Sequence, residues 1–188
     1  MNSYKSLFKI MSDYWSSYGG FRALISSPFF HLAVLITLIS YDFWLKEDWW
    51  LTSIEILPNL IGFTLGGYAI LLAFSDQRFL DIITHKLEGE NTTPYIELNS
   101  SFVHFLILQI SALLVSLIWL AAPIKLSSFF LNASQCIPSL IEVYSVAFII
   151  SNFLSYLLFI YSLTSALGAI LWIFRIATVY DDIDLTEE

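Results

Sequence analysis

Four long apolar blocks constrain this chain more than any other feature of its sequence. The first three read FFHLAVLITLISYDFWL at 29–45, IEILPNLIGFTLGGYAILLAF at 54–74 and FVHFLILQISALLVSLIWLAA at 102–122. The fourth runs from Ile141 to Phe174 and has 34 residues. A helix of about 20 apolar residues crosses the hydrocarbon core of a bilayer, which is about 30 Å thick. The blocks therefore predict membrane-spanning helices.

Composition supports the same class. The chain is 57% hydrophobic and 13% charged, whereas a soluble domain has about 25% charged residues. Strand-like alternation over segments of about ten residues does not recur, which disfavours a transmembrane barrel. A bundle of helices is the other way to satisfy every backbone group in lipid. We predict an all-α polytopic membrane protein whose transmembrane domain, 28–175, has four helices at about 29–45, 54–75, 102–122 and 141–174, with a cytoplasmic loop at 76–101.

Residues 1–27 precede the first block and predict an amphipathic segment on the cytoplasmic side. In SYKSLFKIMSDYWSSY, aromatic and aliphatic residues recur every three or four positions, and the other face carries Lys5, Lys9 and Asp13. This pattern is typical of a helix that lies in the membrane interface, although such a helix is also suited to docking a partner. Gly19-Gly20 then ends the helix. The predicted interfacial anchors are Tyr4, Phe8, Met11 and Trp15, with Trp49 and Trp50 as an aromatic belt between the first two spans.

Lysine and arginine residues near the helix ends predict the orientation. In a four-span model one side receives six of them and the other side two. The six are Lys5, Lys9, Arg22, Arg78, Lys86 and Arg175, and the two are Lys46 and Lys125. Both termini are therefore expected in the cytoplasm. The net charge of −8 and the lack of a basic groove argue against nucleic acid as a direct partner.

The fourth block is too long for one perpendicular crossing, because 34 residues of helix measure about 51 Å. The helix must tilt, project beyond the membrane or break around Ser162 to Gly168. An acidic tail, 176–188, follows it. This tail is either solvated or docks a partner through Asp181, Asp182, Asp184, Glu187 and Glu188.

Small and weakly polar residues mark one face of each span. In the second span they recur every three or four positions, and Pro58 lies about one turn inside its outer end. Such faces allow close backbone approach between helices in lipid. We expect packing within the chain and a homo-oligomer such as a tetramer, with a hinge or pore lining as the alternative. The predicted seam residues are Asn59, Gly62, Gly66, Ala69 and Ala73 in the second span and Ser145, Asn152, Ser155 and Ser162 in the fourth.

Chemistry-bearing side chains are sparse. The midplane of each span has no ionisable residue, since His31 and His104 fall near inner ends and Asp42, Glu55 and Glu142 near outer ends. Neither a catalytic set nor a metal-ligand spacing is evident, and Cys136 is the single cysteine. We expect a non-enzymatic protein with no catalytic site, no metal and no cofactor.

Two functions fit this pattern. One is an oligomeric membrane protein that recruits or signals to a cytosolic protein partner from its inner face; the alternative is a small ion channel or pore-forming effector. With four spans, PNLIGFTLGGYAILLAF in the second of them and a long last helix, the chain resembles the membrane subunit of the bacterial Kiwa anti-phage system. The resemblance implies a homo-oligomer of the bacterial inner membrane that responds to phage attack at the envelope and works with a cytosolic DNA-binding subunit. It assigns no site residue.

Overall fold

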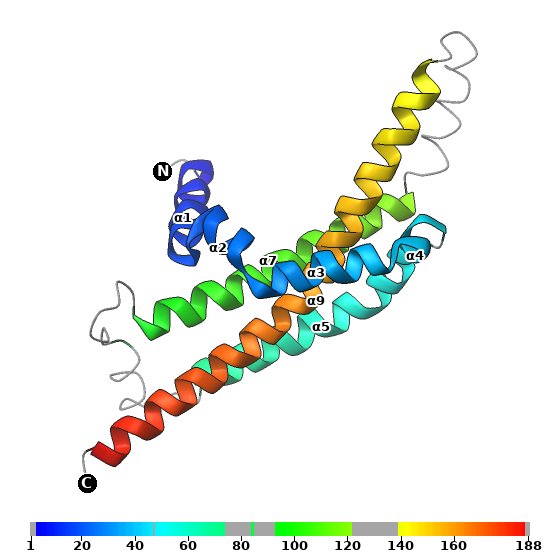
Figure 1. Cartoon of the computed structure of the whole chain (residues 1–188). Helices are drawn as coiled ribbons and strands as arrows, with labels where there is room; N and C mark the ends of the chain where they lie inside the picture. The colour runs from blue at the N-terminus through cyan, green and yellow to red at the C-terminus, as the bar shows by residue number, and fades with distance from the viewer. Residues whose placement is uncertain (1–2, 47, 74–83, 85–92, 122–138, 187–188) are drawn as a thin grey trace.

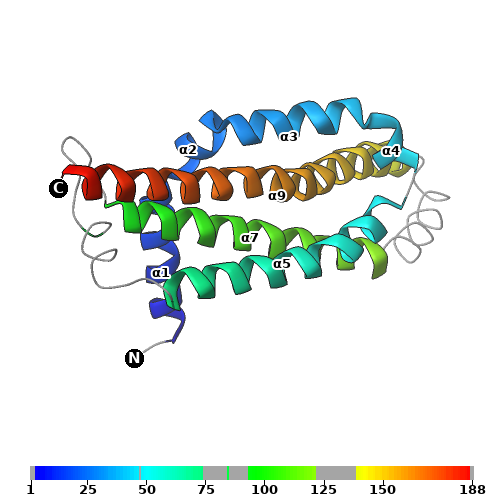
Figure 2. The same cartoon turned by 90° about the horizontal axis from the view of Figure 1, so that it is seen from below.

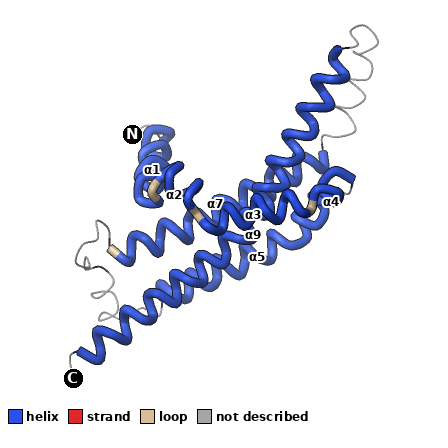
Figure 3. The backbone as a smooth tube through the Cα atoms, viewed as in Figure 1, coloured by secondary structure: helices blue, strands red, loops and turns tan. Residues whose placement is uncertain are grey.

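The computed structural model describes residues 3–46, 48–73, 84, 93–121 and 139–186, and this part of the chain is helical apart from short connections between helices (Figure 3). The all-α prediction is confirmed for these residues. The helices are α1 (Ser3–Tyr18), α2 (Gly20–Ser26), α3 (Pro28–Ile39), α4 (Tyr41–Lys46), α5 (Trp49–Ala73), α7 (Pro94–Ala121) and α9 (Ser139–Thr186).

Four of these helices lie side by side in the order α3, α9, α7, α5 (Figure 2). The neighbours in this row are in contact, with α9 packed on both α3 and α7, and α7 packed on α5. Helix α1 instead crosses α7 at a steep angle, at the same end of the row as the end of α9 (Figures 1 and 2). Among the described helices, α1 therefore lies across the direction of α3, α5, α7 and α9.

Two helices are long and apolar enough to cross a membrane, namely Pro94–Ala121 and the stretch Glu142–Arg175 of α9. A third span results if α2 and α3, which meet at a bend of 55°, together make one crossing. These helices identify the chain as a membrane protein with two or three candidate spans among the described residues. Helix α5 is not one of them.

Two helices begin earlier than the sequence predicts. Helix α7 starts at Pro94, inside the predicted loop 76–101, because Thr93 caps it: the Ile96 amide donates to Thr93 Oγ1 at 3.3 Å. Proline suits the first helical position, where its missing N–H costs no hydrogen bond. Helix α5 starts at Trp49, so Pro58 lies deeper inside it than one turn.

The predicted first span, 29–45, is two helices. Helix α3 ends at Ile39 and α4 begins at Tyr41, with Ser40 between them. The Trp44 indole N–H donates to the Thr37 carbonyl at 2.8 Å, which satisfies one of the acceptors that a helix end leaves open. A side chain that follows the break thus stabilises it.

Helix α9 is continuous over 48 residues and does not break around Ser162 to Gly168. At about 1.5 Å per residue it is about 72 Å long, so it extends beyond a bilayer core. Its last turns include 176–186 of the predicted acidic tail, and Figure 1 shows both of its ends running past the helices beside it.

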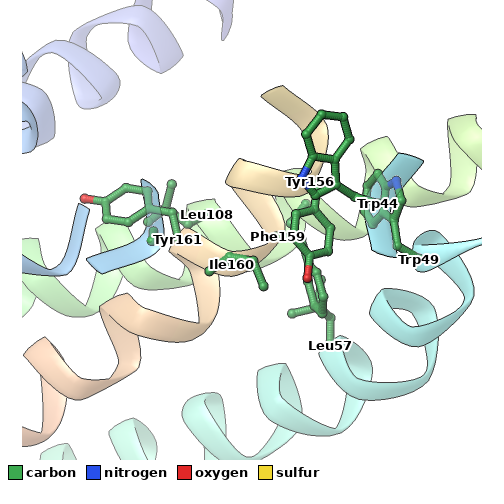
Figure 4. Packing of buried hydrophobic residues seen from close by; sticks show 10 residues of the cluster. Trp44, Trp49, Leu57, Leu108, Tyr156, Phe159, Ile160 and Tyr161 are labelled. Carbon is green, nitrogen blue, oxygen red and sulfur yellow. The ribbon is translucent and has the colours of Figure 1, made fainter. Parts of the chain in front are cut away.

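The core is rich in aromatic side chains at the end of the bundle that holds α4. Trp44, Trp49, Tyr156 and Phe159 are buried there together with Leu57 (Figure 4). Tyr161 belongs to the same cluster but lies nearer α1, with its hydroxyl directed away from the other labelled residues (Figure 4). Aromatic packing thus connects the α4 end of the bundle with the α1 end.

Candidate functional site

A buried histidine holds α1 on the bundle. His104, on α7, is 5% exposed. Its Nδ1 lies 2.6 Å from the Tyr14 hydroxyl of α1, and its Nε2 lies 3.2 Å from the Tyr161 hydroxyl of α9. The Tyr18 ring stacks on the imidazole with centroids 3.8 Å apart. We call His104, Tyr14, Tyr18 and Tyr161 the His104 cluster; it joins α1, α7 and α9 at one point.

The hydrogen bonds of the cluster form a directed chain. A neutral imidazole has one donor and one acceptor nitrogen. The short contact fits the Tyr14 O–H donating to Nδ1, which leaves the Nε2 hydrogen to donate to the Tyr161 hydroxyl. Burial, and secondarily the neighbouring Tyr18, raises the pKa of Tyr14 above its ordinary value, so this hydroxyl keeps its proton at neutral pH. Both imidazole nitrogens are therefore used.

A cavity of about 400 Å³ adjoins the cluster. It lies between the end of α1, α2, the start of α3, the first turns of α7 and residues 161–175 of α9; we call it the α1 cavity. Its walls carry hydroxyl groups, aromatic rings and apolar side chains. The lining includes Ser100, Ser101, Tyr18, Tyr161, Phe29 and Ser165.

An ion pair lies on the wall of this cavity. Arg175 Nη1 and Glu97 Oε2 are 3.7 Å apart, with 45% of the arginine side chain and 24% of the glutamate side chain exposed. Exposed pairs of this kind contribute about 0–1 kcal/mol to stability. The pair therefore matters more for the charge it presents to the cavity than for folding.

The opposite end of the bundle holds a second buried polar group. Asn152 of α9 accepts a hydrogen bond from Trp49 Nε1 at 2.6 Å and donates one to the Trp44 carbonyl at 2.7 Å. Nearby in the same packing, Ser116 donates to Ser53 at 2.7 Å. These bonds fasten α4, α5, α7 and α9 to one another, so we interpret them as structural.

Two further buried polar residues lie between these ends. Gln109 and Thr37 are 0% exposed, and no described atom accepts from or donates to the Gln109 amide or the Thr37 hydroxyl. A buried amide without partners costs free energy. Neither residue lines a described cavity, so neither forms a site.

The predicted seam residues of the second span lie on an open face of α5. Asn59, Gly62, Gly66 and Ala69 are exposed, and a Cβ atom added at Gly62 or Gly66 would meet nothing within 4 Å. The backbone of Ala73 ends α5. The described part of the chain therefore does not cover this face.

The seam residues of the fourth block divide between interior and surface. Asn152 and Ser162 are buried, Ser155 is half-buried and Ser145 is exposed. Ser162 donates to the Phe159 carbonyl of its own helix at 2.7 Å. Part of this face thus packs within the chain.

The predicted anchors also divide. Tyr4, Phe8 and Met11 are 76%, 72% and 44% exposed, and Trp15 is half-buried beside Phe21. Trp50 is half-buried and stacks on Trp119. Trp49, in contrast, is 0% exposed, because its indole N–H finds its partner in Asn152; its position differs from the belt that the sequence predicts.

The proposed docking residues fall at the end of the described chain. Asp181, Asp182 and Asp184 belong to the last turns of α9. Glu187 and Glu188 lie outside the described residues, as do Arg78, His85, Lys86, Lys125 and Cys136.

Sequence reasoning did not single out the His104 cluster. It treated His104 as one of two histidines near inner ends, and Tyr14 and Tyr18 only as parts of an apolar stripe. Tyr14 and Tyr18 are four residues apart and so share a face of α1, which is the available signal. Which helix that face meets depends on the tertiary fold.

The described residues contain no group of three His, Cys, Asp or Glu placed to hold a metal ion. Comparison of the chain with protein-family models, curated proteins and solved structures finds no match. The function is therefore argued from the geometry of the site.

Proposed function

We propose that this chain is a non-enzymatic protein of the bacterial inner membrane that senses a change in the bilayer and passes it to a cytosolic protein partner. In this proposal α3 with α4, α5, α7 and α9 form the four-helix transmembrane bundle, and both termini are cytoplasmic. Anti-phage defence is the physiological setting that the resemblance to the Kiwa membrane subunit suggests.

The observation that carries the proposal is the way α1 is held. Helix α1 packs against α7 and α2. Its polar fastening to the bundle consists of the bond from Tyr14 to His104, the 3.4 Å contact between the Tyr18 and Tyr161 hydroxyls, and the stacking of Tyr18 on His104. A bond between side chains is worth about 0.5–1.5 kcal/mol. Two bonds of this size can be made and broken by modest changes in the surroundings of α1, which is what a two-state sensor requires.

The other end of α1 is apolar and uncovered. Tyr4, Leu7, Phe8 and Ile10 are each more than half exposed. A helix with this surface gains free energy by lying in the headgroup region. Because α1 lies across the long helices (Figure 2), it has the direction of a helix that follows the membrane plane. Its position then depends on lipid packing.

Self-association through the open face of α5 is part of the proposal. Glycine in a helix costs about 1 kcal/mol relative to alanine. Gly62 and Gly66, on the predicted seam, have open space around them among the described residues, so the packing of that part of the chain does not account for them. Close approach of a second copy would account for them.

The partner is expected on the projecting end of α9. Beyond Arg175 this helix continues to Thr186 with Asp181, Asp182 and Asp184, and an acidic helical extension suits a basic protein surface. Deletion of 181–188 should abolish recovery of the proposed cytosolic partner while leaving membrane insertion intact. Unchanged recovery would exclude this end as the docking surface.

The sensing step is tested with a probe on α1 in vesicles. A nitroxide is attached to Ser12→Cys, an exposed position, in a Cys136→Ser background, and lysolipid is added to disturb the leaflet. We expect the probe to become more mobile with added lysolipid, and at a lower lysolipid fraction in Tyr14→Phe and His104→Phe. Tyr41→Phe, an exposed tyrosine at the α4 end, is the control. If lysolipid does not change the mobility of the probe in the wild-type chain, the proposed sensor is wrong.

A channel is the second candidate, and one observation favours it. Glu55 and Asn59 are exposed on α5 and line an open hollow of about 410 Å³ with Ile56, Leu60 and Phe63. In an oligomer that buries this face, a carboxylate and an amide would face a shared axis. Cation flux into vesicles that contain this chain alone, lowered by Glu55→Gln and Asn59→Leu, would favour the channel; no flux would favour the sensor.

A further inference from the structure

In the membrane position proposed above, the α1 cavity falls near the level where a bilayer changes from hydrocarbon to headgroups. Its α7 residues, from Glu97 to His104, belong to the first turns of one candidate span, and its α9 residues end at Arg175, where the other candidate span ends. Helix α7 measures about 42 Å, against a core of about 30 Å. Its first turns therefore reach the headgroup layer.

The wall of the cavity carries one positive and one negative side chain. Arg175 presents a guanidinium group, which binds phosphate oxygens well. The Ser101 hydroxyl lines the same cavity and can donate a further bond to a phosphate, whereas the Ser100 hydroxyl already donates to the Glu97 carbonyl at 3.0 Å. Glu97 presents a carboxylate at 3.7 Å from Arg175, and the rings of Tyr18 and Tyr161 line the same cavity. Carboxylates and ring faces both attract an ammonium group.

The remaining wall is apolar and tightly packed. Phe29 lies so close to Gly168 that a Cβ atom there would be 3.0 Å from its ring. Glycine therefore lets the ring sit against α9, and ring and helix together give a smooth surface beside the charged pair. Such a surface fits the glycerol and first methylene groups of a lipid.

We infer that the α1 cavity binds the headgroup of a glycerophospholipid that carries a phosphate and a primary ammonium, with Arg175 on the phosphate and Glu97 on the ammonium. Arg175 and Glu97 form an ion pair with each other, so a ligand that binds at this pair meets both charges at once. A zwitterionic headgroup offers a phosphate to the guanidinium group and an ammonium to the carboxylate. The inference rests on the membrane position proposed above and not on signal transfer to a partner.

The headgroup also touches the element that is proposed to move. Tyr18 and Ser17 line the cavity from α1, and Tyr18 stacks on His104. A lipid bound there contacts α1, α7 and α9 at once, so it stabilises the arrangement in which α1 is docked. Loss of that lipid from the inner leaflet would release α1.

The test is lipid binding by native mass spectrometry of the full chain in mild detergent. Phosphatidylethanolamine, phosphatidylcholine, phosphatidylglycerol and the water-soluble glycerophosphoethanolamine are each titrated. We expect phosphatidylethanolamine to bind at least about tenfold more tightly than phosphatidylcholine, whose quaternary ammonium has no N–H to donate to Glu97. Equal binding of the three lipids would overturn the inference, and equal binding of the soluble compound would overturn the assignment to a lipid.

Variants locate the site. Arg175→Gln should weaken phosphatidylethanolamine binding about tenfold, and Glu97→Gln should abolish the preference over phosphatidylcholine. Lys46→Gln, which removes an exposed charge at the α4 end, is the matched control. Ser165→Phe fills the cavity without changing charge and should also lower binding, with helix content checked by circular dichroism. Retention of lipid by Arg175→Gln and Glu97→Gln at the level of Lys46→Gln would overturn the site. Lipid binding is measured without a cytosolic partner. A negative result for lipid binding can therefore be told apart from a negative result for the proposed sensor.

Discussion

Single buried polar side chains determine how the helices of this protein are joined. Asn152 takes a hydrogen bond from Trp49 and gives one to the Trp44 carbonyl, so one amide ties the α4–α5 corner to α9. All three residues are buried. In such surroundings a polar group that loses its partner costs more than the bond itself contributes.

This asymmetry predicts the effect of removing one partner. Trp49→Phe keeps a ring but leaves Asn152 Oδ1 without its donor, and we expect a loss of about 1–3 kcal/mol in unfolding free energy. Asn152→Leu leaves both the Trp49 N–H and the Trp44 carbonyl without their partner. We therefore expect its loss in unfolding free energy to be at least as large. The measurement is denaturant unfolding in detergent followed by circular dichroism.

The double variant supplies the control. Trp49→Phe with Asn152→Leu removes the donor and the acceptor together, so it should be less destabilised than the sum of the single variants. Additive losses would mean that the two side chains act independently and that the 2.6 Å bond contributes nothing.

At this scale the sequence identified residue types better than their partners. Asn152 was assigned to the polar face of the last helix, and it does lie inside. Trp49 and Trp50 are adjacent and chemically identical, yet one is buried and the other half-buried. Tryptophan suits both a lipid interface and a core, so only the packing of α9 against α5 decides between the two.

At the scale of elements, the turn between α1 and α2 sets the direction of α1. Gly19 has φ +97° and Gly20 has φ +63°, values that L side chains rarely adopt. A Cβ atom at Gly19 would also be 2.9 Å from Ala23 Cβ. The turn therefore needs glycine at 19 both for its backbone angle and for space.

Gly19→Ala should disturb this turn by about 1–2 kcal/mol from the left-handed backbone alone, with the contact to Ala23 added. We expect α1 to leave His104, which raises the mobility of a nitroxide at residue 12 without added lysolipid. Gly67→Ala is the control, because Gly67 is helical with open space around it and alanine is the better helix former. A probe that stays immobile in Gly19→Ala would show that the turn does not position α1.

Helix existence was more predictable than helix ends. Thr93-Pro94 carries the capping signal for the start of α7, yet polar residues after it favoured a loop. The break at Ser40 has no glycine or proline to mark it and depends on the bond from Trp44 to Thr37. A break in α9 was one of three alternatives that length alone could not separate, and the structure excludes it because α9 is continuous.

For the whole molecule, the basic residues that the structure describes gather at one end. Lys5 and Lys9 of α1, Arg22 of α2 and Arg175 of α9 belong to the end where α1 crosses α7, while Lys46 lies at the α4 end. The sequence predicts this grouping of charges because counting them needs only the order of the spans. That this end faces the cytoplasm stays a prediction. The position of α1 over α7 depends on the tertiary fold.

The open face of α5 leads to the last prediction, which concerns assembly. A Cβ atom at Gly62 or Gly66 meets no described atom within 4 Å, so we expect the monomer to fold with leucine at either position. If a second copy packs there, the bulk should separate the helices and weaken the oligomer by at least about tenfold. Gly67→Leu makes the same change one position along α5, also in open space, but off the predicted seam. Mass measurement in mild detergent should therefore find the oligomer preserved in Gly67→Leu and reduced in Gly62→Leu and Gly66→Leu. If the wild-type chain is found only as a monomer, the predicted oligomer is wrong. If all three variants lose the oligomer equally, the contact lies on another face of α5 than the predicted seam.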